Sequence, residues 1–333
     1  MDNKKRIVGK IIIIYLMILG FFPVTIAVGQ DVVYSQFYAN PLYLNPSLAG
    51  STLSKRLAAN YRNQWPSLNN AFTTYSVSYD QYVDAMSGGF GVLASTDRNV
   101  GGLMSSSSAY LMYAYRLRAS RTVGINMGLG AGVYQRSIDW NSLIFENPEN
   151  EIKVDNSSHV VPDFNFGAVL GYKDVFYIGT AMHHMTQPNI SFYDEGLDKL
   201  HIRYTFHMGG NIFFGNTYRY YTDEPPKLML SPAVIYIHQN IHQQINLGMN
   251  FTVYPFVFGM WYRNNLKNSD AAIVLVGFHL QGFQFGYSYD LTISKFSNAT
   301  GGAHEISLGY RFAQSKLSKR TIEKQKEIPC PRF

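Results

Sequence analysis

His183 and His184 are adjacent in the sequence, and two neighbouring histidines raise the question of a metal site. Successive residues of a β-strand point to opposite faces, so two adjacent imidazoles on a strand cannot readily bind one ion. No Cys cluster or third close ligand completes a set of the kind that holds zinc. His201 and His207 lie near another predicted strand and would converge only by accident of register. We therefore expect loop or girdle histidines and no bound metal.

The sequence also lacks the spacings that catalysis most often uses. It contains no H-E-x-x-H, no G-x-S-x-G and no P-loop. The adjacent acids Asp194 and Glu195 stand in a polar stretch, where solvated surface is the default. A glycine run at 128, 130 and 132 lacks the G-x-G-x-x-G spacing and the following helix of a dinucleotide site. We expect no enzyme and no cofactor, with an outer-membrane hydrolase as a distant alternative.

The elements that must position these residues are strands, because apolar and small or polar residues alternate along most of the chain. In residues 303–312, for example, Ile306, Leu308 and Tyr310 share one face, whereas Glu305 and Ser307 share the other. Such segments are longer than the roughly 5–6 residues usual in soluble sheets. Fourteen strands are predicted, near 56–62, 72–80, 88–95, 106–118, 121–134, 163–172, 174–183, 202–214, 227–237, 242–254, 256–263, 271–280, 282–291 and 303–312.

Composition indicates where such a sheet would lie. Aromatic residues make up 15% of the chain, with 25 Tyr and 22 Phe, and charged residues only 15%; soluble domains average roughly 25% charged. Short and long connections between the predicted strands tend to alternate, as the two ends of a bacterial barrel require. We therefore predict an all-β protein, a transmembrane antiparallel up-and-down β-barrel of about 14 strands over residues 56–312. Its environment would be outer-membrane lipid, with both termini in the periplasm.

Residues 1–29 have the layout of a cleaved signal peptide. Four basic residues lie among the first ten, residues 11–22 are almost uninterruptedly apolar, and small residues precede Gln30. The alternative is an uncleaved anchor helix. Pro23 interrupts the apolar run, which is shorter than the roughly 20 residues that a spanning helix needs. Cleavage between Gly29 and Gln30 is the prediction.

The charge distribution excludes a nucleic-acid partner. Residues 1–29 carry a net charge of +3 and residues 313–333 one of +4, so the whole-chain charge of +6 leaves the body at −1. A body of that charge offers no basic surface to follow phosphates. The basic residues of 313–333 instead form a short periplasmic tail. We interpret the tail as a strip for docking a partner, the alternative being a solvated, disordered end. Its docking residues are Lys319, Arg320, Lys324, Cys330 and Phe333.

Residues 30–55 are aromatic-rich but show no strand alternation, and they contain two Asn-Pro steps. Proline disfavours helix at the residue before it and cannot donate to a strand ladder. Our hypothesis is that this segment folds into the lumen as a plug against a glycine-rich wall, the alternative being a periplasmic linker. The residues that define the segment are Tyr34, Gln36, Tyr38, Asn40, Asn45, Pro46 and Gly50. The small lumen-facing wall is formed by Gly124, Gly128, Gly130 and Gly132.

The residues from Gln30 to Gly50, QDVVYSQFYANPLYLNPSLAG, resemble the opening of the PorP/SprF family of outer-membrane proteins. Further similarity lies in the stretches NYRNQW (60–65), TYSVSYD (74–80), GGFG (88–91) and YIGTA (177–181). It continues to His183, His184 and Gln187-Pro188-Asn189, so the resemblance covers nearly the whole mature chain.

This resemblance implies a barrel of the type IX secretion and gliding-motility apparatus that faces the periplasm. It implies support for the export or surface attachment of adhesins, together with type IX secretion components and a periplasmic peptidoglycan-binding lipoprotein. The alternative function is a channel for uptake of apolar solutes, similar to fatty-acid transporter barrels.

Overall fold

The computed structural model describes residues 30–52, 54–68, 72–99, 102–120, 122–139, 157–192, 196–214, 228–266, 268–293 and 301–312. The expected signal peptide, the acids Asp194 and Glu195, and the tail residues Lys319, Arg320, Lys324, Cys330 and Phe333 fall outside these ranges. No helix within them is long and apolar enough to cross a membrane.

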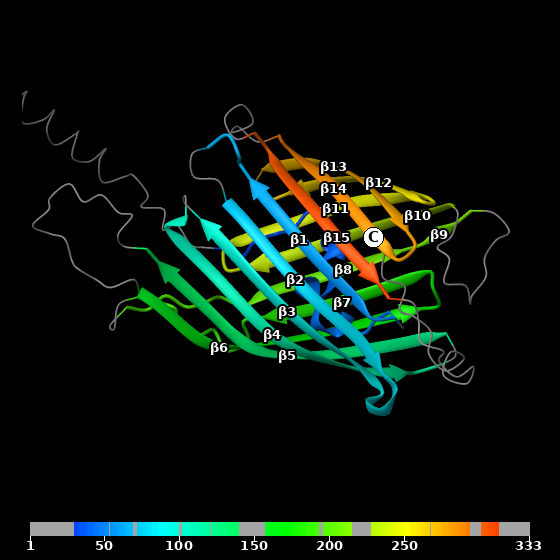
Figure 1. The fold of residues 1–333 in the computed structure, drawn as a ribbon, viewed down its shortest axis with the longest axis horizontal. Coiled ribbons are helices and arrows are strands. Elements are labelled where there is room, and N and C mark those ends of the chain that lie inside the picture. The colour runs from blue at the N-terminus through cyan, green and yellow to red at the C-terminus, as the bar shows by residue number, and fades with distance from the viewer. Residues whose placement is uncertain are drawn as a thin grey trace, which may run out of the picture. The chain divides into compact units, whose positions relative to one another are not determined.

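Antiparallel strands make up nearly all of the regular structure (Figure 1). Their bounds are β1 Arg56–Gln64, β2 Phe72–Val83, β3 Gly88–Asn99, β4 Met104–Arg118, β5 Val123–Ile138, β6 Ser157–Tyr172, β7 Phe176–His183, β8 Arg203–Gly210, β9 Ile212–Phe213, β10 Leu228–Gln239, β11 His242–Val253, β12 Phe256–Asn264, β13 Ser269–Leu280, β14 Phe283–Thr292 and β15 Ala303–Arg311. A single turn of 3₁₀ helix, η3 (Asp84–Met86), connects β2 to β3.

The sheet closes on itself. Apart from β8 and β9, each strand pairs with the next strand along the sequence, and β1 pairs with β15 along all nine of its residues. The short β9 continues β8 after a break at Asn211, and both pair with β10. Counted as one strand, they make the barrel fourteen-stranded. The predicted all-β class, antiparallel topology and strand number are therefore confirmed.

Several predicted bounds fell short of the observed strands, since β2 ends at Val83 instead of residue 80 and β3 at Asn99 instead of residue 95. Strand β5 runs on to Ile138 and β6 begins at Ser157, so these two strands pair along 16 residues each. The sequence hid these ends because Gln135 and Ser137 replace apolar residues on the outer face, and because Pro162 cannot donate to a ladder. Pro162 is tolerated because β7 pairs with β6 only over Phe166–Tyr172, which leaves the proline on an edge.

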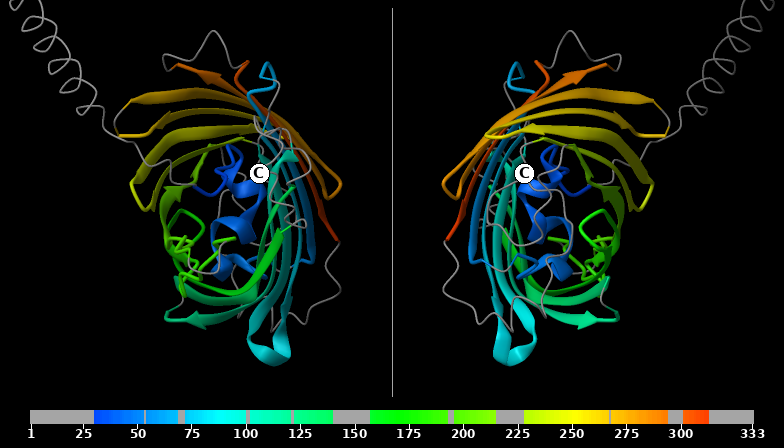
Figure 2. Two further views of the ribbon diagram at one scale, coloured as in Figure 1. Left: turned by 90° about the vertical axis from the view of Figure 1, so that its left-hand side faces the viewer. Right: turned by 90° about the vertical axis from the view of Figure 1, so that its right-hand side faces the viewer.

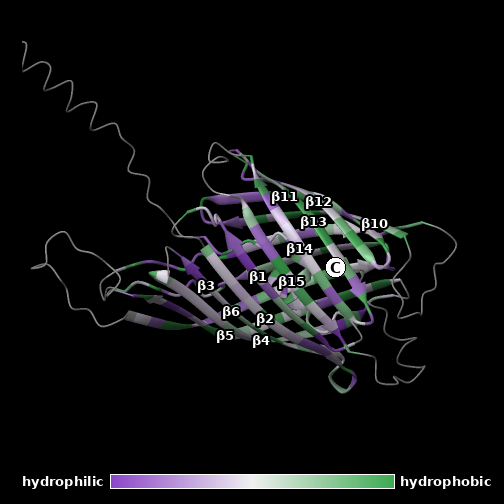
Figure 3. Ribbon diagram, turned by 45° about the horizontal axis from the view of Figure 1, so that its top comes forward, coloured by the Kyte–Doolittle hydropathy of each residue, from purple (hydrophilic) through white to green (hydrophobic). Residues whose placement is uncertain are grey.

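The two faces of the barrel wall differ in polarity, as the alternation predicts. Large apolar side chains point outward and are exposed, with Leu111 at 69%, Leu129 at 62% and Met260 at 71%. Inward positions hold serines, asparagines, glycines and buried charges such as Arg62 and Glu305. Figure 3 shows hydrophobic and hydrophilic residues alternating along the strands. An outer face of this kind is suited to a hydrocarbon environment.

The N-terminal segment, defined here as residues 32–52, folds into three short turns inside the ring of strands (Figure 2). They are η1 (Phe37–Ala39), α2 (Pro41–Leu44) and η2 (Pro46–Leu48). Each Asn-Pro step opens a turn, because proline is preorganised for the first helical position and its missing N–H is not needed there. The side chain of Asn45 caps η2 by accepting from Ser47 N at 2.9 Å.

Candidate functional site

The N-terminal segment packs against four inner-wall glycines, Gly89, Gly91, Gly128 and Gly167, which we call the glycine wall. A Cβ at Gly128 would collide with the backbone of Pro46 and Ser47, and one at Gly167 with the Asn45 side chain. Only a residue without a side chain allows these close approaches.

The four glycines predicted for the small wall have different surroundings. Gly128 contacts the segment, whereas Gly124 has nothing within 4 Å of an added Cβ. Gly130 lies beside Asn165 and Met112, and Gly132 beside the neighbouring strand β4. One of the four thus belongs to the glycine wall, and the sequence analysis missed the other three members. Their inward position in predicted strands was the signal that could have identified these three glycines.

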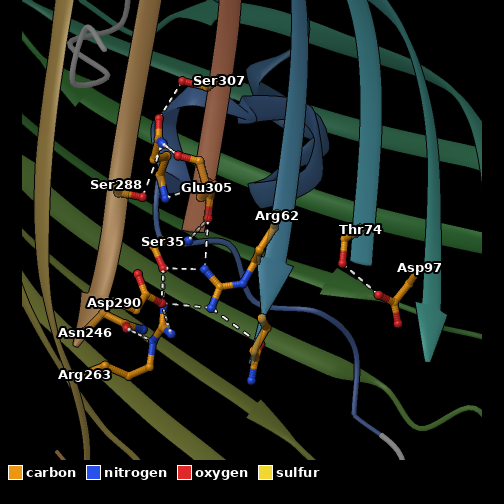
Figure 4. Close-up of polar contacts among 12 residues, drawn as sticks. Ser35, Arg62, Thr74, Asp97, Asn246, Arg263, Ser288, Asp290, Glu305 and Ser307 are labelled. Atoms are coloured by element: carbon orange, nitrogen blue, oxygen red, sulfur yellow. Dashed lines mark hydrogen bonds and ion pairs between the residues drawn. The ribbon is translucent and has the colours of Figure 1, made fainter. Parts of the chain in front are cut away.

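On the other side of the lumen, the segment meets a group of polar side chains on β1, β12, β14 and β15 (Figure 4). We call these residues the seam cluster, because β1 and β15 are the strands that close the barrel. Its members are Arg62, Arg263, Ser288, Asp290, Glu305 and Ser307.

Four charges in the seam cluster are buried and paired with one another. Arg62 binds Asp290 at 2.8 Å and Glu305 at 3.1 Å, and Arg263 binds Asp290 at 2.9 Å. The Arg62 side chain is 2% exposed and that of Glu305 is fully buried. Two positive and two negative charges balance, which is the condition for burying ions at acceptable cost.

Ser35 and Gln36 of the segment complete this cluster. The backbone N–H of Ser35 donates to Glu305 Oε2 at 2.7 Å, and that of Gln36 to Glu305 Oε1 at 3.0 Å. The Ser35 hydroxyl donates to Asp290 Oδ2 at 2.6 Å. Both carboxylates therefore accept hydrogen bonds from the segment as well as from the arginines.

A second ionic anchor lies at the other end of the segment. Arg56 and Asp80 form a buried pair with a nitrogen–oxygen distance of 2.8 Å, and Asp80 also accepts from Gly50 N at 2.7 Å. Arg116 donates to the carbonyls of Gly50 and Ser51 at 3.0 and 2.9 Å. Gly50 has φ +60°, a conformation that glycine adopts without strain.

The middle of the segment is held by aromatic and amide contacts. Asn45 Nδ2 donates to the carbonyl of Thr180 at 3.0 Å and lies 3.1 Å from His207 Nε2. Tyr177 donates its hydroxyl to that of Tyr38 at 2.7 Å, and their rings meet edge to face. These contacts continue into an apolar core cluster on the inner wall.

Tyr34 and Tyr43 line a small cavity of about 20 Å³ beside Arg203. The Arg203 guanidinium lies 4.5 Å from the centre of the Tyr43 ring and donates to its hydroxyl at 2.8 Å. Burial raises the pKa of the Tyr34 phenol well above its ordinary value. A cavity of this size holds about one water molecule.

Each of the residues that define the predicted segment has a described position in the structure. Gln36, Asn45 and Gly50 bond to the inner wall as described, and Pro46 packs on Gly128. Asn40 donates to Ser76 Oγ at 2.7 Å. Tyr34 and Tyr38 are buried, with exposed fractions of 3% and 6%.

His184 and His201 lie outside the strands, whereas His183 of β7 and His207 of β8 are buried and are not loop or girdle residues. His183 and His184 are 4% and 5% exposed, because the left-handed backbone at His184 (φ 60°) interrupts the strand alternation. His184 Nδ1 lies 2.6 Å from Asp163 Oδ2, and Tyr110 donates to the same oxygen. In the described part of the chain, no group of three His, Cys, Asp or Glu side chains is placed to hold a metal ion.

Sequence reasoning missed the charged residues that organise the site. Arg62, Asp290 and Glu305 each occupy the inward position of an alternating strand, a place where an unpaired charge would be costly. A charged residue at an inward position therefore predicts that an oppositely charged partner lies nearby. The identity of the partner depends on strand order around the barrel, which alternation does not give.

A closed antiparallel barrel with an apolar outer face and a polar inner face is an outer-membrane β-barrel. The chain belongs to the family of type IX secretion system membrane proteins PorP/SprF, whose model matches residues 27–310. This match confirms the resemblance noted in the sequence, and the outer membrane is the protein's location.

Solved structures of other outer-membrane proteins are similar to this chain. The Ralstonia pickettii toluene transporter TbuX aligns with a TM-score of 0.51 and 8% identity over 88% of this chain and 98% of its own. A Pseudomonas aeruginosa FadL homologue gives 0.46 and 11% over 81% and 93%. The Acinetobacter baumannii outer membrane protein Omp33 gives 0.46 and 9% over 79% and 100%. Among curated proteins, none matches this chain.

Proposed function

We propose that the protein is a non-catalytic component of a type IX secretion and gliding apparatus, which supports export or surface attachment of adhesins by binding partners. The family membership supports a place in this apparatus. The structural observation that supports the binding role is the position of the N-terminal segment inside the ring of strands, where both of its ends are hydrogen-bonded to buried ion pairs of the wall. A barrel occupied in this way acts through its ends rather than by conduction.

The partners in this proposal are type IX secretion components, a periplasmic peptidoglycan-binding lipoprotein and a surface adhesin. Both termini lie in the periplasm, and the tail residues Lys319, Arg320, Lys324, Cys330 and Phe333 dock a periplasmic partner. A mild-detergent pulldown from the native outer membrane, followed by mass spectrometry, tests this. Recovery of the barrel without any type IX component contradicts the proposal.

Truncation after Ala313 tests the tail separately. The shortened protein is expected to insert normally and to lose its periplasmic partner, with impaired export of its adhesin. Normal export of every adhesin by an inserted, truncated barrel excludes the docking role while leaving the rest of the proposal intact.

The N-terminal segment acts in this proposal as a plug. Its removal is expected to raise single-channel conductance in planar bilayers, whereas an unchanged trace contradicts plugging.

The alternative function is uptake of apolar solutes through the lumen, favoured by the fold shared with the toluene transporter TbuX. The position of the N-terminal segment inside the ring of strands argues against it. Uptake of an apolar solute by liposomes that contain the intact protein would support this alternative.

A further inference from the structure

The contacts at Ser35 and Gln36 have the features of a peptide-binding site. Glu305 receives two consecutive backbone N–H groups, one on each carboxylate oxygen, at 2.7 and 3.0 Å. The Ser35 hydroxyl donates to Asp290 and accepts from Arg62 Nη1 and Arg263 Nη2, each at 2.8 Å. Both the backbone N–H and the hydroxyl of Ser35 are therefore hydrogen-bonded to charged side chains of the wall.

The Gln36 carboxamide is hydrogen-bonded to the wall through both its nitrogen and its oxygen. Its Nε2 donates to Ser288 Oγ at 3.2 Å and to the Glu305 carbonyl at 2.9 Å, and its Oε1 accepts from the Ser307 hydroxyl. The residue is 1% exposed. A buried site that uses both ends of a carboxamide discriminates strongly against side chains that lack one of them.

The charges of the seam cluster match a neutral peptide. Two arginines and two carboxylates sum to zero, so an acidic side chain in place of Ser35 would face Asp290, and a basic one would face Arg62 and Arg263. The ligand chemistry is therefore a bent peptide with two consecutive free N–H groups, a small hydroxyl and a following carboxamide.

The same side chains bridge the closing strands of the barrel. Arg62 of β1 and Glu305 of β15 are directly opposite in the antiparallel register. Glu305 is in turn opposite Ser288 of β14. The atoms that bind Ser35 and Gln36 are thus the ones that connect β1 to β15 and β14 on the lumen side (Figure 4).

We propose that the seam cluster is a peptide-binding site selective for a Ser-Gln step, and that the N-terminal segment occupies it in cis and thereby holds the β1–β15 seam closed. Segment binding and seam closure form one coupled equilibrium. Each then stabilises the other by the same factor, as linkage requires. This inference concerns the barrel itself and does not depend on a role in secretion.

The first test separates the segment from the barrel without removing it. A protease site is inserted between residues 52 and 55 of the full chain, the folded protein is cleaved in detergent, and segment retention is followed by gel filtration. Labelled synthetic peptide 30–52 is then added in excess to measure exchange. The cleaved wild-type segment is expected to stay bound and to exchange slowly.

Matched peptides test the selectivity. Ser35→Ala removes a hydroxyl that touches three charged side chains, and should speed release on the order of tenfold to a hundredfold, since hydrogen bonds to charged groups are the strong ones. Ser47→Ala makes the same chemical change, but that hydroxyl donates only within the segment, to Asn45 Oδ1 at 2.7 Å. It should release far more slowly than the Ser35→Ala peptide.

The second test measures whether β1 and β15 stay paired when the segment leaves. Ala59 and Leu308 are opposite across β1 and β15, and Leu111 and Ala131 across β4 and β5. Each pair is replaced by cysteines, with Cys330 changed to Ala, and treated with a short thiol cross-linker. After the cleaved segment is displaced, the cross-linking yield of the seam pair should fall, whereas the yield of the control pair should not change. In the reverse experiment, a barrel whose seam is already cross-linked should retain the segment longer.

Two results overturn the inference. One is equal release of the wild-type and Ser35→Ala segments, which removes the selectivity. The other is an unchanged seam yield after the segment has left, which removes the coupling. Since all measurements start from the full, folded chain, neither result can be attributed to a barrel that failed to assemble.

Discussion

Two sides of the lumen hold the same segment by opposite means. At the seam, buried charges on β1, β12, β14 and β15 bind Ser35 and Gln36 through hydrogen bonds. Across the lumen, Gly128 and Gly167 bind the Asn45-Pro46-Ser47 turn through the absence of side chains. The difference shows that one peptide can be specified by charge near its start and by shape in its middle.

The two mechanisms fail differently. A hydrogen-bonded charge cannot be removed without stranding its partner, so the seam side is sensitive to any loss of a group. A close backbone approach is sensitive only to a gain of atoms. The expected effects below follow from this contrast, in decreasing order of size.

The largest effect is expected for Arg62→Met, which leaves Asp290 and Glu305 short of a cation in a buried site. The barrel should lose about 3–5 kcal/mol of unfolding free energy, the usual cost of breaking a buried pair. Urea unfolding in lipid or detergent, followed by tryptophan fluorescence, measures it. Arg136→Met is the control, because Asp198 in that pair is 53% exposed and such a bridge contributes about 0–1 kcal/mol. Equal losses for the two variants contradict the buried-charge account.

Gly128→Leu should come next, at about 3 kcal/mol or somewhat less, because the added atoms must displace the Pro46–Ser47 backbone. The same unfolding assay applies, and accelerated proteolysis of the segment should accompany the loss. Gly124→Leu offers the matched control on the same strand, since nothing lies within 4 Å of its added Cβ. If the Gly124 substitution costs as much, strand propensity rather than close packing is responsible.

Asn45→Ala tests the middle of the segment. It removes the donor to the Thr180 carbonyl and the cap on Ser47 N, and leaves His207 Nε2 without its amide neighbour. About 1–3 kcal/mol of unfolding free energy should be lost, as for a buried polar group that loses its partner. Thermal unfolding monitored by circular dichroism is the measurement, and an unchanged midpoint would show that the barrel does not depend on this turn.

The smallest effect is expected for Tyr38→Phe, which deletes only the hydroxyl that accepts from Tyr177 at 2.7 Å. The ring contacts remain, so the loss should be about 0.5–1.5 kcal/mol. The double variant with Tyr177→Phe should cost little more than either single change, because both remove the same bond. Strict additivity in that cycle contradicts a direct hydrogen bond.

Much of the fold was predictable because alternation is a local property. In β15, Ile306 and Leu308 alternate with Glu305 and Ser307, and that pattern suffices to place a strand and assign its faces. The prediction was incomplete where the local signal changed, as at Gln135 and Ser137, or where a backbone angle reversed the alternation, as at His184.

The sequence by itself determined a wall of alternating strands and an aromatic N-terminal segment that could not join it. Its proline steps also determined where the segment turns. Only the tertiary structure decided that Ser35 meets Glu305, 270 residues away, and that Gly128 and Gly167 rather than Gly124 receive the turn. The physical reason is that pairing across the lumen depends on strand order, stagger and closure, which no single strand encodes.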